Sequence, residues 1–99
     1  MGKVEVLALS QDMTIARDEF LRSLPGAVAG AAFEVEGSAI RPAEPGRGWR
    51  IVLDPLPDLC LGAIRLQRHR VSIFLAGHDD AATRRFLERF ELYFRRGGG

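Results

Sequence analysis

Cysteine and long apolar runs are nearly missing from this chain of 99 residues, and lysine is as rare as cysteine. The single thiol cannot form an internal disulfide, and one cysteine falls short of every cysteine-based zinc spacing. No apolar run approaches the roughly 18 residues that a membrane-crossing helix needs. The apolar stretch near the N-terminus is too short, and charged residues occur too early in it, for a secretory signal peptide. We therefore expect a soluble, cytoplasmic protein whose thiol stays reduced.

An excess of charge of one sign is also missing. Fourteen basic residues against thirteen acidic ones leave a net charge of +1, which argues against a protein that coats nucleic acid or membranes. The charge is unevenly spread: residues 1–45 carry a net charge of −3, residues 46–78 of +3 and residues 79–99 of +1. Such a chain can pair with itself head to tail, or it can place both signs on one folded surface.

What is present is an ordinary globular composition, 46% hydrophobic and 27% charged. The length suits a single small domain over residues 1–99, and no repeat or linker divides it.

Residues 3–9 alternate weakly, so two interpretations stay open for residues 1–11: a flexible extension or an extra strand. From Asp12 the apolar residues recur at helical spacing, with Asp12 or Thr14 as the N-cap. Pro25-Gly26 predicts the end of this helix after Leu24.

The middle of the chain changes to the period of strands. Phe33–Glu36 and Ala39–Arg41 flank the two-residue turn Gly37-Ser38, a hairpin that places Glu34 opposite Arg41.

Three further strands are expected after this hairpin. Residues 49–54 alternate as a half-buried strand, which the Pro55–Asp58 stretch breaks. Residues 59–66 and 71–76 follow as two strands joined by a hairpin near residues 67–69. The run 71–76 is apolar on both faces, which is typical of a central strand covered by a helix.

The last segment has the clearest helical pattern. Asp79 or Asp80 caps it, and Glu91 and Arg95 stand at the favourable i, i+4 spacing. Gly97 suits a left-handed C-cap, and residues 97–99 are expected to be a flexible tail. A competing strand over residues 90–96 stays open, because its apolar residues also alternate.

These elements predict an α+β fold of two layers, an antiparallel sheet of four to five strands flanked by an N-terminal and a C-terminal helix. If residues 3–9 and 90–96 were both strands, the order would approach a ferredoxin-like plait, which is the alternative fold.

A basic cluster is the strongest local lead to a binding site. It comprises Arg65, Arg68, His69 and Arg70. At a hairpin tip, arginine side chains suit phosphate or carboxylate. Three interpretations stay open: a solvated basic turn, a site for small anions, and a contact with nucleic acid.

Other chemistry-bearing residues are expected to be structural. Cys60 lies in an apolar strand, where a buried and inert thiol is the usual case. His69 and His78 lie at opposite ends of one expected strand and do not converge on a metal. His78-Asp79-Asp80 is typical of a helix cap, with an acid–base dyad or metal site as the alternative. No nucleophile elbow, dinucleotide fingerprint or P-loop occurs, so we expect no cofactor and no enzymatic role.

The chain end, Phe94-Arg95-Arg96-Gly97-Gly98-Gly99, resembles the glycine-ended tail of ubiquitin-like carrier proteins. The resemblance covers only these six residues and implies a carrier whose terminal carboxylate is activated. The helical pattern before the tail departs from those carriers, which reach it from a strand.

Apolar surface gives the main functional prediction. The last helix is apolar on more than one side, and we expect an interface that includes Phe86, Phe90, Tyr93 and Phe94. The uncovered sheet face carries Val52 and Phe74, with Leu59 or Leu61, and such patches commonly mark subunit contacts. We therefore expect a small non-enzymatic interaction module that forms a homodimer or binds another protein. Nucleic-acid or anion binding through residues 65–70 is the alternative.

Overall fold

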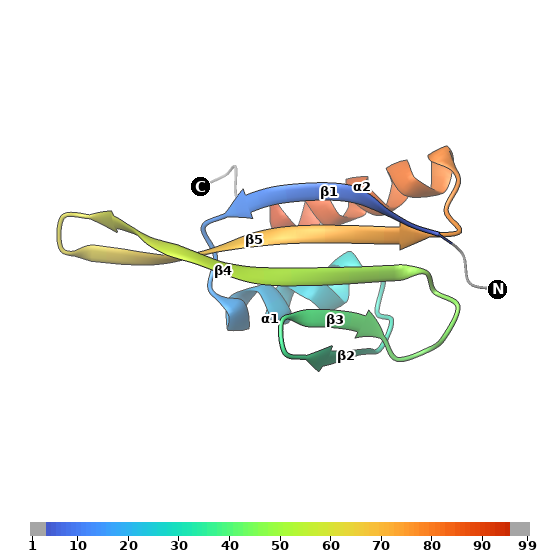
Figure 1. Cartoon of the computed structure of the whole chain (residues 1–99), viewed down its shortest axis with the longest axis horizontal. Coiled ribbons are helices and arrows are strands. Elements are labelled where there is room, and N and C mark those ends of the chain that lie inside the picture. Colours follow the sequence, from blue (N-terminus) through green and yellow to red (C-terminus); the bar gives the residue numbers. More distant parts are fainter. Residues whose placement is uncertain (1–3, 96–99) are drawn as a thin grey trace.

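The computed structural model describes residues 4–95, which fold into two layers. One layer is a five-stranded antiparallel sheet of β1 (Glu5–Met13), β2 (Phe33–Glu36), β3 (Ala39–Pro42), β4 (Trp49–Leu61) and β5 (Ile64–Ala76). The strand order is β1-β5-β4-β3-β2. The other layer holds α1 (Arg17–Ala27) and α2 (Asp80–Phe94), which both lie behind the sheet in Figure 1. The predicted two-layer α+β class is confirmed.

The core lies between the helices and the centre of the sheet. Alternate residues of β4 and β5 face the helices in register, with Ile51 opposite Ile73. From the helical layer, Phe20 of α1 stacks on Phe94 of α2 with ring centroids 4.5 Å apart. The other fully buried side chains belong to the same cluster: Leu24, Ile40, Leu53 and Val71. Strand alternation and the helical stripe thus meet in one apolar layer.

The N-terminal segment is an extra strand over Glu5–Met13, the second of the two interpretations for that part of the chain. It pairs with β5 along its length, from Glu5 opposite Ala76 to Met13 opposite His69. This strand also corrects the start of the first helix, because Asp12 belongs to β1 and cannot cap α1.

Both predicted ends of the first helix are wrong. The helix begins at Arg17 after Ala16, whose side chain makes no capping hydrogen bond. It continues through Pro25 to Ala27 instead of ending at Leu24. A proline in the last turn removes only one backbone donor, and the turn is closed by the Val28 N–H, which donates to the Leu24 carbonyl at 3.0 Å.

The last segment is a helix up to Phe94, so the competing strand is wrong. Asp79 is the N-cap: its Oδ1 accepts from the Ala82 N–H at 2.7 Å. Arg95 donates to Glu91 at 2.6 Å, the predicted i, i+4 pair. The predicted Gly97 cap and the tail 97–99 lie outside the described residues. With β1 at one sheet edge and a helix at the chain end, the ferredoxin-like alternative fails as well.

The β2–β3 hairpin has the predicted register, with Glu34 opposite Arg41. The guanidinium nevertheless bonds Glu36 at 2.6 Å, the diagonal neighbour on the same face, rather than Glu34.

Strands β4 and β5 are longer than predicted, 13 residues each. Their turn lies at Gly62-Ala63, not near residues 67–69, and the Pro55–Asp58 stretch does not break β4. β3 pairs with β4 only at Ile51 and Val52, so the described chain offers no partner on that side of β4 farther out. A proline there forfeits no ladder hydrogen bond, and a register shift between Leu56 and Leu59 absorbs the irregularity.

The outer part of this hairpin projects from the rest of the molecule (Figure 1). We call residues 56–68 the arm, because β1 stops at the level of His69 and the arm continues beyond it. The remaining described residues are the body. The projection gives the molecule its elongated extents of 50 × 28 × 22 Å.

Candidate interaction surface

The arm carries four exposed aliphatic side chains that lie on one face. Leu59 stands opposite Leu66, and Leu61 opposite Ile64. Because strand side chains alternate between faces, both pairs lie on the same side of the ribbon. Their exposed fractions are 38% and 38% for the first pair and 56% and 59% for the second. We call these four residues the aliphatic face of the arm.

Cys60 lies on the opposite side of the arm, in register with Arg65. The expectation of a buried thiol is wrong: Cys60 is exposed. The flanking residues Leu59 and Leu61 predicted a core strand, but they lie in the arm, outside the core.

The sheet has an open face in the body, on the side away from the helices. Phe74 of β5 and Val52 of β4 lie there half-buried, as expected, and Leu7 of β1 is in register with Phe74. Leu7 is about half exposed. The open face is therefore partly apolar near its centre.

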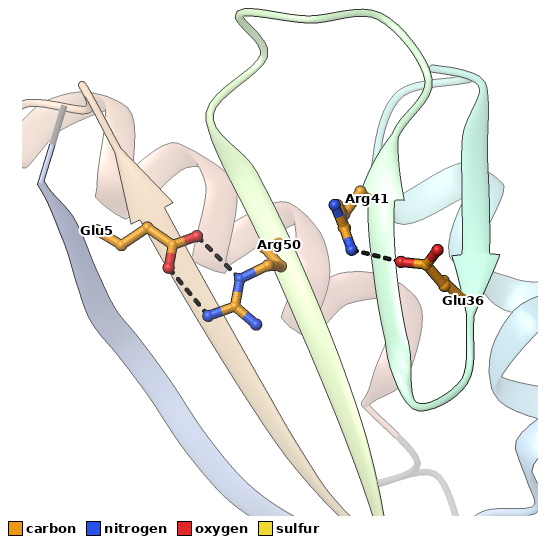
Figure 2. Close-up of polar contacts among 4 residues, drawn as sticks. All are labelled: Glu5, Glu36, Arg41 and Arg50. Atoms are coloured by element: carbon orange, nitrogen blue, oxygen red, sulfur yellow. Dashed lines mark hydrogen bonds and ion pairs between the residues drawn. The ribbon is translucent and has the colours of Figure 1, made fainter. Parts of the chain in front are cut away.

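Ion pairs surround these apolar residues on the open face. Arg50 Nε and Nη2 donate to the two carboxylate oxygens of Glu5, both at 2.9 Å (Figure 2). The same guanidinium lies 4.3 Å from the Phe74 ring centroid. The hydrogen bond from Arg50 lowers the pKa of Glu5, against a smaller opposing effect of desolvation. Figure 2 also shows the Arg41–Glu36 pair. These two ion pairs are formed within the chain, whereas Asp54, on the same face in register with Arg70, makes no ion pair among the described residues.

The basic cluster is divided by the structure. Arg70 donates to Asp12 at 2.9 Å, and Arg68 lies 3.7 Å from the same carboxylate. The hydrogen bond from Arg70 is the main cause of the lowered pKa of Asp12. Arg65 lies on the other face of β5, 3.9 Å from Asp58. Of the predicted anion site, only Arg68 and Arg70 therefore share a surface.

His69 belongs to the buried layer. Its ring Nδ1 lies 2.8 Å from the Ile15 carbonyl oxygen, and the residue is 7% exposed. Alternation along β5 separates it from Arg68 and Arg70, which point to the open face. His69 thus fixes the chain between β1 and α1 to the root of the arm.

The four predicted interface residues of the last helix have different environments. Phe90 and Phe94 are buried against Phe20, and half-buried Phe86 lies near Trp49. Tyr93 is exposed beside Arg89, whose guanidinium lies 5.4 Å from the ring centroid. The helix is broadly apolar because it packs on both the sheet and α1.

Other candidate sites offer less. His78 Nδ1 lies 3.1 Å from the Ala76 carbonyl, and Asp79 is occupied as a cap. Among residues 4–95 there is no group of three His, Cys, Asp or Glu side chains that could hold a metal, and no helix that could span a membrane.

A cleft of about 560 Å³ lies between β1 and α2. Its lining is mixed, with apolar residues such as Leu9, Met13 and Leu87 and polar ones such as Gln11 and Glu91.

The sequence predictions missed Ile64 and Leu66 as surface residues. The signal was the symmetry of apolar residues about Gly62-Ala63: Leu59 and Leu61 precede this turn, and Ile64 and Leu66 follow it at the same spacing.

Comparison with known proteins gives no further guide: no family model, curated protein or solved structure matches the chain.

Proposed function

We propose that this chain is a small non-enzymatic interaction module that works as a homodimer, with the arm as its contact element. The observation that carries the proposal is the aliphatic face of the arm: four branched side chains gathered on one side of a two-stranded ribbon, outside the core. Contiguous exposed apolar surface of this kind commonly marks a protein contact.

The energetic argument follows from the exposure of these side chains. Fully burying a leucine or isoleucine contributes roughly 1.5–3 kcal/mol, so covering a half-exposed one contributes about 1 kcal/mol. Four such residues from each of two copies contribute favourably to a dimer's binding free energy. A two-fold dimer uses every one of them twice, and closed two-fold symmetry is the commonest solution among soluble oligomers.

The paired arginines favour this function over nucleic-acid or anion binding. Arg65, Arg68 and Arg70 each lie within ion-pair distance of a carboxylate of the same chain. Phosphate binding would have to displace Asp12 or Asp58, whereas covering the aliphatic face displaces only water. Salt separates the two functions, because phosphate contacts weaken steeply with ionic strength and apolar contacts do not.

Sedimentation equilibrium tests the proposal directly. Wild-type protein is expected to be a dimer whose dissociation constant changes little between low and high salt. The double variant Leu61→Asp/Ile64→Asp is expected to be a folded monomer, because it puts two charges into the contact.

The matched control is Leu92→Asp, which changes a 71% exposed leucine on α2, outside the arm. It is expected to dimerise like wild type. A monomeric wild type, or a dimer broken by Leu92→Asp and not by the arm variant, would contradict the proposal.

A further inference from the structure

The aliphatic face of the arm is continuous with the open face of the body. Along β5, alternation places Ile64 and Leu66 on the same side as Arg68, Ser72 and Phe74. The register shift between Leu56 and Leu59 adds its extra residue to β4, so the alternation of β5 is unbroken. One uncovered surface therefore runs from the tip of the arm to the far end of the sheet.

The arm alone is too small to hold two copies together. Its four aliphatic side chains expose on the order of 200 Å², estimated from their burial free energies at about 25 cal/mol per Å². A standard stable interface needs about 800 Å² from each partner. The contact must therefore extend from the arm onto more of the same uncovered surface.

The lengths of the arm and of the open face point to a second copy. From Arg68 outward the arm spans four residue steps to Ile64, about 13 Å before its turn, and the body continues β5 for six steps from Arg70 to Ala76, about 20 Å. A two-fold axis across the strands near the Leu56–Arg68 pair would place each arm over the open face of the other copy.

We propose that the arms are exchanged in this way: the aliphatic face of each arm lies on Val52 and Phe74 of the second copy. This inference rests on the proposed function and adds the receiving surface. Sheets packed face to face lie about 10 Å apart, close enough for the leucines of the arm to contact the opposite sheet. Beside Phe74, Glu5 and Arg50 are joined by two hydrogen bonds, so covering this part of the receiving surface leaves neither charge without a partner.

The single cysteine provides the test. Cys60 is exposed on the side of the arm away from the aliphatic face, so a nitroxide label attached there stays outside the proposed contact. Cys60 is in register with Arg65, three steps from the proposed axis. The two labels of an exchanged dimer are separated by about 20 Å along the strands, besides the 10 Å between sheets and the outward reach of both labels, so a pulsed dipolar experiment is expected to give about 30 Å. Arms stacked only on each other lack the separation along the strands and would bring the labels to about 20 Å.

A variant of the receiving surface gives a second readout. Val52→Asp is expected to weaken dimerisation at least about tenfold, because a charge would enter the centre of the contact. Val35→Asp is the control: it is the same change on an exposed valine of β2, on the helix side of the sheet in register with buried Ile40. Circular dichroism checks that both variants fold. If Val52→Asp does not fold, the distance between the Cys60 labels still tests whether the arms are exchanged.

The outcomes separate the two proposals. A monomeric wild type contradicts the proposed function itself. A dimer with labels about 20 Å apart, or a folded Val52→Asp variant that dimerises like wild type, contradicts arm exchange and leaves the dimer standing.

Discussion

The two halves of the β4–β5 hairpin have the same backbone pairing and opposite environments. In the body, Ile51 and Ile73 face each other and are 0% exposed; in the arm, Leu61 and Ile64 face each other and are more than half exposed. Residue type and cross-strand pairing are alike, so neither causes burial. The difference is the face of the sheet: Ile51 and Ile73 point to the helices, whereas Leu61 and Ile64 point to the open face, which no described helix covers.

This comparison explains how the arm can exist without a core. An isolated two-stranded ribbon is marginally stable in water, but this one extends a ladder that the body already holds in register. Pro55 and Pro57 lie in a part of β4 that has no neighbour on the side away from β5 among the described residues, and prolines at an edge oppose uncontrolled pairing with other strands. The exposed feature of the arm is thus its aliphatic face rather than its β4 edge.

The largest expected effect sharpens the comparison within a single strand. Ile73→Ala is expected to lower the free energy of unfolding by about 2–5 kcal/mol, because it leaves a cavity in the core. Ile64→Ala, nine residues earlier on β5, is expected to cost less than about 1 kcal/mol in the monomer, because its side chain is mostly in water. Urea denaturation of both variants at a concentration where the chain is monomeric measures the two values. Equal losses would mean that the arm is packed within its own chain.

A smaller effect is expected at the boundary between arm and body. His69→Leu removes the hydrogen bond to the Ile15 carbonyl and leaves that buried acceptor without its partner, at a cost of about 1–3 kcal/mol. Gln67→Leu, two residues outward on the same strand and exposed, serves as the control and should be nearly neutral. Thermal melts of the two variants make the comparison, and similar melting temperatures would show that the body does not extend to His69.

The smallest expected effect concerns pH and the open face. The pKa of Glu5 is lowered in the folded state by its hydrogen bond with Arg50. The stabilisation is therefore fully present above the unfolded pKa of about 4.3 and is lost as pH falls through the lower folded value. Because both side chains are partly exposed, Glu5→Gln is expected to cost only about 0.5 kcal/mol at pH 7 and nothing at strongly acid pH. Urea denaturation at both pH values measures this difference; a constant cost at all pH values would contradict it.

Much of the body could be predicted from the sequence. The period of two in residues 33–41 predicted the β2–β3 hairpin and its register, and the apolar stripe with Asp79 before it predicted α2. These features are local: a turn glycine, a cap and a face that repeats at one spacing. The start of α1 was missed because Asp12, a good cap by residue type, is used by β1 to pair with Arg70.

The arm could not be predicted in the same way. Whether Pro55 and Pro57 end a strand depends on whether that strand has a neighbour on their side, which is a property of the whole sheet. Gln67, Arg68 and His69 have the polarity of a turn, yet they lie in a strand because the real turn is supplied by Gly62, with a φ of +61°. Cys60 and its flanking leucines look like core residues until the register shows that the leucines lie on the face of the sheet away from the helices.

Hydrogen exchange measured at two protein concentrations tests the role of the arm most directly. The account predicts that amides of residues 56–68 exchange quickly in dilute, monomeric protein and become protected as concentration rises, while the body is protected throughout. Arm amides that exchange equally fast at both concentrations, in a sample shown to be dimeric, would contradict it.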